Sequence, residues 1–149
     1  MRLSISNALG LAAVLLGTVL AGPAQAGDSH PFATAHYVIQ VSEADPARWN
    51  LAMNNAQNLQ NAYGPDKVEV VIVAYGPGLK MLLKKAKTAK RVESLSMGGV
   101  EFDACHNTMK HMAKKLGHMP AMNRAAKVVP GGVVRIGELE QKGYSYIKP

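Results

Sequence analysis

One apolar run constrains the fold of this chain more than any other feature. Residues 68–74 read Val-Glu-Val-Val-Ile-Val-Ala, which is nearly continuous β-branched apolar sequence rather than strict alternation. Such a run is typical of a strand that is covered on both faces, as in a parallel sheet. We therefore expect this stretch to be a central strand of an α/β sheet.

Strand and helix signals alternate along the rest of the chain. Asp45 followed by Pro46 predicts the start of a helix that ends at Gly64, because an N-cap residue precedes a proline at the first helical position. A second helix is expected from about Leu79 to Lys87 or beyond. The other expected strands span 36–41, 99–104, 127–129 and 144–147, and the other expected helices span 109–116 and 133–141. This order predicts a single three-layer α/β domain with a mainly parallel five-stranded sheet.

The N-terminus has the pattern of a cleavable signal peptide. A basic start is followed by an uncharged apolar stretch, and the small residues Ala24 and Ala26 stand at the −3 and −1 positions of a cleavage site. The apolar stretch is shorter than the roughly 20 residues that a membrane-spanning helix needs. We expect residues 1–26 to be removed, which leaves a periplasmic or secreted domain over 27–149 without a stable membrane anchor.

The sequence contains a single cysteine, Cys105, which cannot form an internal disulfide. Packing alone must therefore hold the exported domain together. An unpaired thiol in an oxidising compartment is either a small buried core residue or the chemical centre of the protein. Composition leaves both alternatives open.

The position of Cys105 favours a functional role. Ligands of open α/β sheets bind beyond the carboxyl ends of the strands, and Cys105 lies in a turn between an expected strand and its helix. The free N–H groups at the start of that helix would favour a thiolate. Asp103 points to the same face of the strand and would oppose ionisation. Glu101 shares this polar face, which predicts either an edge strand facing solvent or contact with a wet pocket or an oligomer partner.

Two further motifs have competing interpretations. The segment Tyr75-Gly-Pro-Gly78 matches neither the dinucleotide fingerprint nor a P-loop, so we expect a tight turn that approaches its neighbour closely. The second motif is a group of cations that come after this segment at helical spacing, in a chain with a formal charge of +7. They form either a solvated face or a site for anionic lipid, polyanion or an acidic partner, whereas nucleic acid is not expected. These cations are Lys80, Lys84, Lys87 and Arg91, with Lys85 and Lys90 nearby.

The segment 105–122 is rich in methionine and histidine. On a helix, Cys105, Met109 and Met112 would share a face and could form a soft-ligand set for Cu(I). Methionine at helical spacing is more often core filler. We expect no metal and no cofactor.

Several blocks of sequence together resemble the DsrE/DsrF-like family, in its signal-bearing single-domain branch. The most specific are Ala74-Tyr-Gly-Pro-Gly78 and Ala104-Cys-His-Asn-Thr108, and the likeness covers nearly the whole of 27–149. The resemblance implies a compact α/β sandwich that forms homo-oligomers, often trimers or hexamers. It also implies a cysteine, at the position of Cys105, that carries sulfane sulfur as a persulfide in some relatives.

Two functional hypotheses follow. The first is a sulfur (persulfide) carrier or sulfurtransferase that acts through Cys105, with an unknown sulfur donor and acceptor. The second is a non-catalytic oligomeric binding module for a small ligand or protein partner. The loops expected to line the pocket contribute Tyr75, Gly76, Gly78, Asn107 and Thr108.

Overall fold

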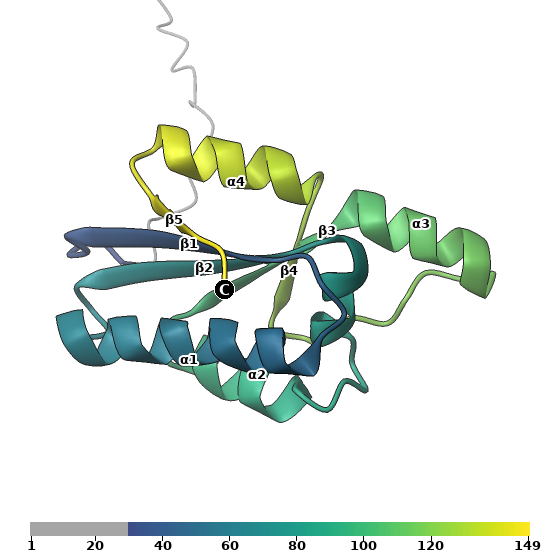
Figure 1. Cartoon of the computed structure of the whole chain (residues 1–149), viewed down its shortest axis with the longest axis horizontal. Coiled ribbons are helices and arrows are strands. Elements are labelled where there is room, and N and C mark those ends of the chain that lie inside the picture. Colours follow the sequence, from purple (N-terminus) through teal and green to yellow (C-terminus); the bar gives the residue numbers. More distant parts are fainter. Residues whose placement is uncertain (1–29) are drawn as a thin grey trace, which may run out of the picture.

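The computed structural model describes residues 30–149, so the expected signal peptide lies outside the described residues. Within 30–149, strands and helices alternate along the chain (Figure 1). None of the helices in this part is long and apolar enough to cross a membrane. The elements are β1 (Ala35–Val41), α1 (Pro46–Tyr63), β2 (Val68–Ala74), the 3₁₀ helix η1 (Gly76–Leu82), α2 (Ala89–Met97), β3 (Glu101–Cys105), α3 (His106–Leu116), β4 (Ala126–Val129), α4 (Gly132–Gln141) and β5 (Ser145–Ile147).

The five strands form one sheet in the order β4-β3-β2-β1-β5, and every neighbouring pair is parallel. The run 68–74 is the central strand β2, and its Val71 lies opposite Val38 of β1 and Glu101 of β3. This arrangement confirms the predicted parallel α/β sheet.

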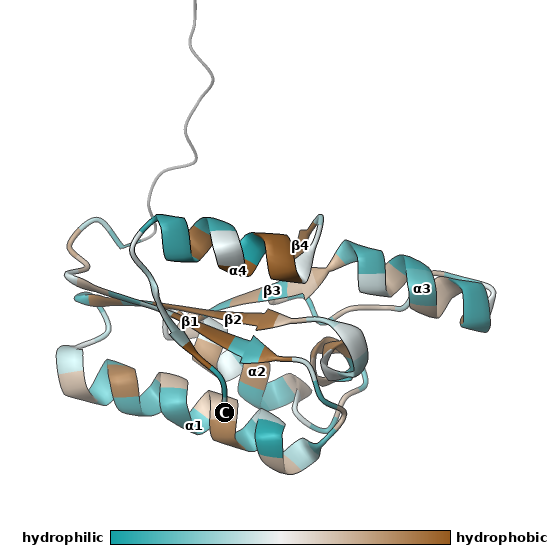
Figure 2. Cartoon of the chain, turned by 45° about the horizontal axis from the view of Figure 1, so that its top comes forward, coloured by the Kyte–Doolittle hydropathy of each residue, from teal (hydrophilic) through white to brown (hydrophobic). Residues whose placement is uncertain are grey.

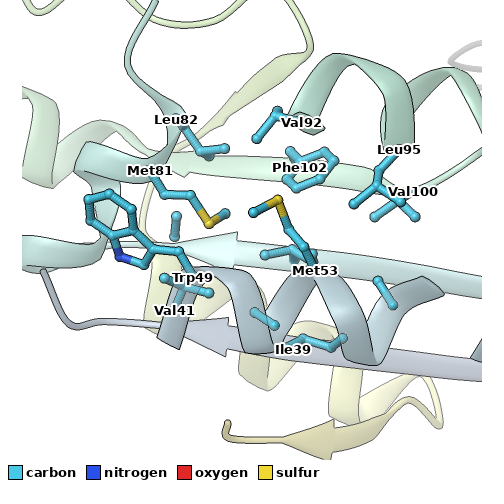
Figure 3. Close-up of a cluster of buried hydrophobic side chains, with 14 of the residues drawn as sticks. Ile39, Val41, Trp49, Met53, Met81, Leu82, Val92, Leu95, Val100 and Phe102 are labelled. Atoms are coloured by element: carbon cyan, nitrogen blue, oxygen red, sulfur yellow. The ribbon is translucent and has the colours of Figure 1, made fainter. Parts of the chain in front are cut away.

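Helices cover both faces of the sheet. Figure 1 shows α1 and α2 on one side and α4 on the other, while α3 extends past the end of the sheet. The α1/α2 side holds the larger apolar core, where Trp49, Met53 and Phe102 pack together (Figure 3). The α4 side holds a smaller core that includes Val71 and Leu139. Because β2 faces both cores, its sequence is apolar at every position except Glu69 (Figure 2).

The start of α1 follows its sequence signals. Asp45 caps the helix by accepting a hydrogen bond from the backbone N–H of Ala47 at 2.8 Å, and Pro46 occupies the first helical position. The buried face of α1 includes Trp49 and Met53. The helix ends at Tyr63, directly before Gly64, whose φ of 90° favours glycine.

The prediction of a helix from about Leu79 to Lys87 or beyond is wrong. Its place is taken by η1, a stretch of turns over 83–88, and then α2. Long-range contacts hold the turns: the backbone N–H of Lys84 donates to the carbonyl of Ala121 at 2.9 Å, and the Thr88 hydroxyl donates to the carbonyl of Met81 at 2.7 Å. These partners compete with helical hydrogen bonds. The cations from Lys80 to Arg91 are therefore spread over three segments instead of forming one helix face.

Candidate functional site

Cys105 is the last residue of β3 and the residue that caps α3. The structure has no turn over 105–108, and α3 begins at His106, three residues before the expected start. The prediction of a loop position for Cys105 is therefore wrong, although its place at the carboxyl edge of the sheet is as expected. An extended backbone at Cys105 (φ −68°, ψ 112°) leads the chain directly from strand into helix.

The thiol of Cys105 lies where the N-termini of two helices meet. The backbone N–H groups of Asn107 and Thr108, from α3, and of Gly132, from the start of α4, lie close enough to stabilise negative charge on its sulfur, as does the Thr108 side chain. Burial alone would raise the pKa of Cys105, but these donors outweigh it and hold the pKa below that of an ordinary thiol. The arrangement favours the anionic form of the sulfur.

The Thr108 hydroxyl connects the thiol to the loop after β2. The backbone N–H of Gly76 donates to Thr108 Oγ1 at 2.9 Å. Because that contact uses the oxygen as acceptor, the hydroxyl proton remains for the sulfur of Cys105. Three chain segments therefore contribute to the environment of one sulfur atom: the β2–η1 turn, the start of α3 and the start of α4.

The polar face of β3 is covered by α4. The expectation of a solvent-facing edge strand is wrong, because β4 lies outside β3 and an arginine of α4 reaches the polar face. Arg135 donates from Nε to Oδ2 of Asp103 at 2.7 Å and from Nη2 to Oε1 of Glu101 at 2.9 Å. Lys127 of β4 also donates to Oε1 of Glu101, at 3.0 Å. Arg135 was not among the residues predicted for the site, although an arginine within the apolar stretch Val133-Val-Arg-Ile136 was an available signal.

Asp103 is the most deeply buried ionisable group of this cluster, with no exposed surface. Burial raises its pKa to about 6, and the charge of Glu101 adds to the rise, in spite of the hydrogen bond from Arg135. Its Oδ1 atom has no hydrogen-bond partner among the described residues. Asp103 was expected to disfavour a Cys105 thiolate. Asp103 instead pairs with Arg135, and the pKa of Cys105 is lowered.

The Tyr75-Gly-Pro-Gly78 segment makes the close approach that its sequence predicts. Gly78 donates from its backbone N–H to the carbonyl of Ser42 at 3.1 Å, and a Cβ atom at Gly78 would lie 2.3 Å from the carbonyl oxygen of Val41. Gly76 has a φ of +52°, in the left-handed region. The Tyr75 side chain packs on Gly132, where a Cβ atom would lie 2.8 Å from the Tyr75 Cβ. Glycine at 78 therefore lets η1 lie against the end of β1, and glycine at 132 lets the start of α4 lie against Tyr75.

Two open grooves flank this centre. The larger, of about 690 Å³, lies between η1 and α3, and Gly76, Asn107 and Thr108 line it. The smaller, of about 260 Å³, lies between β4 and α4. Tyr75 and Gly78 line neither groove, so only three of the five expected pocket residues share one. Cys105 is 5 % exposed and lies behind the groove walls rather than in them.

The methionines near Cys105 serve packing. Met109 is buried in the larger core, and Met112 packs against that core from the side. His111 and His118 are exposed. Among residues 30–149, no three His, Cys, Asp or Glu side chains lie close enough together to hold a metal ion.

Comparisons with known proteins agree with this architecture. The model of the DsrE/DsrF-like family matches residues 35–149. The solved structure of MTH1491 from Methanobacterium thermoautotrophicum, a protein of unknown function, is similar with 28% identity and a TM-score of 0.70, over 77% of this chain and 99% of that one. BT1422 from Bacteroides thetaiotaomicron, also of unknown function, has the same fold at 12% identity and a TM-score of 0.52, over 76% and 94% of the two chains. No curated protein matches the sequence. The chain belongs to the DsrE/DsrF-like family.

Proposed function

We propose that the protein is a sulfur carrier that binds one sulfane sulfur atom on Cys105 as a persulfide. The observation that carries this proposal is the convergence of two helix N-termini and the Thr108 hydroxyl on the Cys105 sulfur, which lowers its pKa. A thiolate is the nucleophilic form of cysteine. Membership of the DsrE/DsrF-like family, which is linked to sulfur relay, supports the same chemistry.

The loading step is a thiolate exchange. The Cys105 thiolate attacks the outer sulfur of a donor persulfide R–S–SH, a new S–S bond forms to Cys105, and the donor S–S bond breaks. The donor leaves as R–S⁻, and Cys105 becomes Cys–S–SH. In the release step an acceptor thiolate attacks the outer sulfur and restores the Cys105 thiolate. Neither step needs an oxidant or a reductant, because the sulfane sulfur passes between thiols of equal oxidation state.

The hydrogen-bond donors around Cys105 would act in both directions. The N–H groups of Asn107, Thr108 and Gly132 stabilise negative charge on the Cys105 sulfur before loading. They stabilise it again when Cys105 is the leaving group during release. A thiol with a lowered pKa is a good leaving group, which suits a carrier that must yield its sulfur.

Mass spectrometry tests the carrier proposal. The protein is incubated with sodium tetrasulfide, and the peptide that bears Cys105 is expected to gain about 32 Da per sulfur atom. Cys105→Ser is the control and should gain nothing. If the native peptide gains no sulfur while the thiol is reduced and alkylates fully after denaturation, the carrier proposal fails.

A specific observation favours a second candidate, the non-catalytic binding module. Cys105 is only 5 % exposed and lines neither groove. If this burial excludes reactants, the thiol of the folded protein should resist iodoacetamide at every pH from 6 to 9. A pH-dependent reaction with a midpoint below that of free cysteine supports the carrier instead.

We also propose a homo-oligomer, a trimer or hexamer. The family likeness supports assembly, and so do three exposed valines, one in the edge strand β4 and two at the start of α4: Val128, Val133 and Val134. Unpaired edge strands and exposed apolar side chains are features that association covers. Light scattering at micromolar concentration should give a multiple of the monomer mass, and a monomer mass would contradict the proposal.

We propose further that the chain is exported and cleaved after Ala26, as its N-terminal sequence indicates. The domain would then work in the periplasm or outside the cell. Intact-mass measurement of the protein from the exported fraction should show Gly27 as the first residue. Recovery of the full chain from the cytoplasm alone would contradict this location.

A further inference from the structure

The larger groove combines an apolar floor with a basic rim. Pro77 of η1 and two residues of α3, Met112 and Leu116, supply apolar surface, and Leu116 is 50 % exposed. Lys80 and Lys115 stand on the two sides of the same groove. A surface of this kind suits a ligand that has both apolar groups and negative charges.

The positive charge of the groove is not compensated within the described chain. The residues that line it fall within 76–80 and 107–116, and the longer stretches around them, 70–92 and 104–137, contain no Asp or Glu. Lys80 and Lys115 form no ion pair with any residue of 30–149, whereas Arg124 and Arg135 each pair with a carboxylate. The lysines of the groove are thus available to a partner of opposite charge.

The shape of the groove favours a polypeptide segment over a small molecule. Small ligands are usually enclosed, whereas this groove is an open trough between η1 and α3. Helix α3 extends past the end of the sheet (Figure 1). Helix-in-groove recognition uses apolar anchors against a trough of this kind. Met112 adds an adaptable side chain to the wall.

We infer that this groove binds an acidic amphipathic segment of a partner protein, with apolar side chains against Met112 and Leu116 and carboxylates beside Lys80 and Lys115. The role of the partner, which is to donate or accept sulfur, rests on the proposed function. Thr108 and Asn107 line the groove and also supply donors near the Cys105 sulfur, so only this wall separates a segment seated there from the thiol. A second copy of the chain that docked through the same groove would bring its own lysines against Lys80 and Lys115, so repulsion between like charges disfavours that occupant.

Fluorescence anisotropy with designed peptides tests the inference. The probe is a fluorescein-labelled peptide of repeated Glu-Leu-Leu-Glu units, and its counterparts repeat Lys-Leu-Leu-Lys and Glu-Ser-Ser-Glu. The native protein is expected to bind the first peptide at least roughly tenfold more tightly than either counterpart. The double variant Lys80→Glu/Lys115→Glu should weaken this binding by at least roughly tenfold.

The matched control exchanges two exposed lysines away from the groove. Lys67→Glu/Lys142→Glu changes the net charge by the same amount, and its binding should stay within about twofold of the native protein. Leu116→Ser should also weaken binding, because it removes an apolar contact without changing charge. Circular dichroism melting establishes that each variant is folded.

Four results would overturn the inference. Equal weakening by both double variants would show nonspecific charge attraction, and equal binding of the Glu-Ser-Ser-Glu peptide would show that the apolar floor is not used. Capture of phosphatidylglycerol vesicles through Lys80 and Lys115, with no peptide binding, would assign the groove to a membrane. Loss of self-association in the Lys80→Glu/Lys115→Glu variant, again with no peptide binding, would assign it to a second copy.

The docking inference and the carrier proposal fail separately. Sulfur gain at Cys105 without groove-dependent peptide binding defeats the docking inference alone. Groove-dependent peptide binding without sulfur gain defeats the carrier proposal alone.

Discussion

The two faces of the sheet bury different kinds of side chain. On the α1/α2 face a large apolar cluster surrounds Phe102, and the buried polar groups there, such as Thr88, are neutral and hydrogen-bonded. On the α4 face a small apolar cluster lies beside the buried carboxylate of Asp103 and the thiol of Cys105. Apolar burial stabilises a fold, whereas a buried ion pair contributes little net stability. The comparison indicates that one face supplies most of the stability and the other can carry ionised groups.

The strongest test of this division is Phe102→Ala. Truncation of a fully buried phenylalanine in the large cluster should lower the free energy of unfolding by about 3–5 kcal/mol. Urea denaturation measures the loss. The pH profile of Cys105 alkylation in the folded protein should stay unchanged, because that residue faces the other side. A loss below about 1 kcal/mol would contradict the role of this core.

Arg135→Met is the corresponding change on the α4 face. Without the guanidinium, the buried Asp103 carboxyl has lost its charged partner and its pKa rises further, so the free energy of unfolding at pH 7 should fall by about 2–4 kcal/mol. The double variant Arg135→Met/Asp103→Asn should recover part of this loss. If the double variant is no more stable than Arg135→Met, the cost does not arise from an unpaired Asp103.

The pH dependence of stability should identify Asp103. Its folded pKa of about 6 lies above the value near 4 of an unfolded aspartate, so between about pH 4 and 6 the folded state holds a proton that the unfolded state releases. Acidification from pH 7 to 5 should therefore stabilise the native protein relative to Asp103→Asn, by about 1 kcal/mol. The pKa of Glu101 is lowered, so its contribution to the free energy of unfolding is lost only below the range from pH 7 to 5. Parallel stability curves for the two proteins would contradict the raised pKa.

Thr108→Val should alter reactivity more than stability. Loss of the hydroxyl removes a donor that lowers the pKa of Cys105, so this pKa should rise and alkylation at pH 7 should slow by about three- to tenfold. Thr88→Val is the matched control, because it removes a buried hydroxyl on the other face without touching the thiol. Equal alkylation rates in native protein and Thr108→Val would exclude the hydroxyl as a determinant.

The smallest effect is expected from Arg124→Ala. Arg124 pairs with Glu93 at 3.0 Å, but its side chain is largely exposed. Solvent and salt screen such pairs, so the free energy of unfolding should change by less than about 0.5 kcal/mol. A loss comparable to that of Arg135→Met would show that exposure does not separate the two ion pairs.

The sequence predicts this fold well where local signals and burial agree. The apolar run of β2 and the capped start of α1 each identify their element, because periodicity and capping residues lie close together in the sequence. The break at 83–88 is not predicted, because the partners that hold it, such as Ala121, are distant along the chain. Local propensity cannot anticipate such tertiary competition.

The candidate site was predicted only in part. Cys105 and Thr108 belong to one recognisable block, so their proximity follows from the sequence. The contributions of Gly132 and Arg135 come from α4, and they depend on how that helix packs over β3. Sequence spacing does not report that packing. The pairing of Asp103 with Arg135 was therefore not predicted. Without that pairing, the sequence could not explain why Asp103 does not suppress the thiolate.

The single cysteine has a consequence for the stoichiometry of the proposed carrier. Cys105 has no second thiol in the chain to resolve its persulfide into a disulfide. A loaded sulfur would stay until a separate molecule arrives, so each chain has one carrier thiol and discharge is second order, with a rate proportional to acceptor concentration. An oligomer of such chains would then have one carrier thiol per subunit. Within one subunit, no sulfur could pass from one thiol to another.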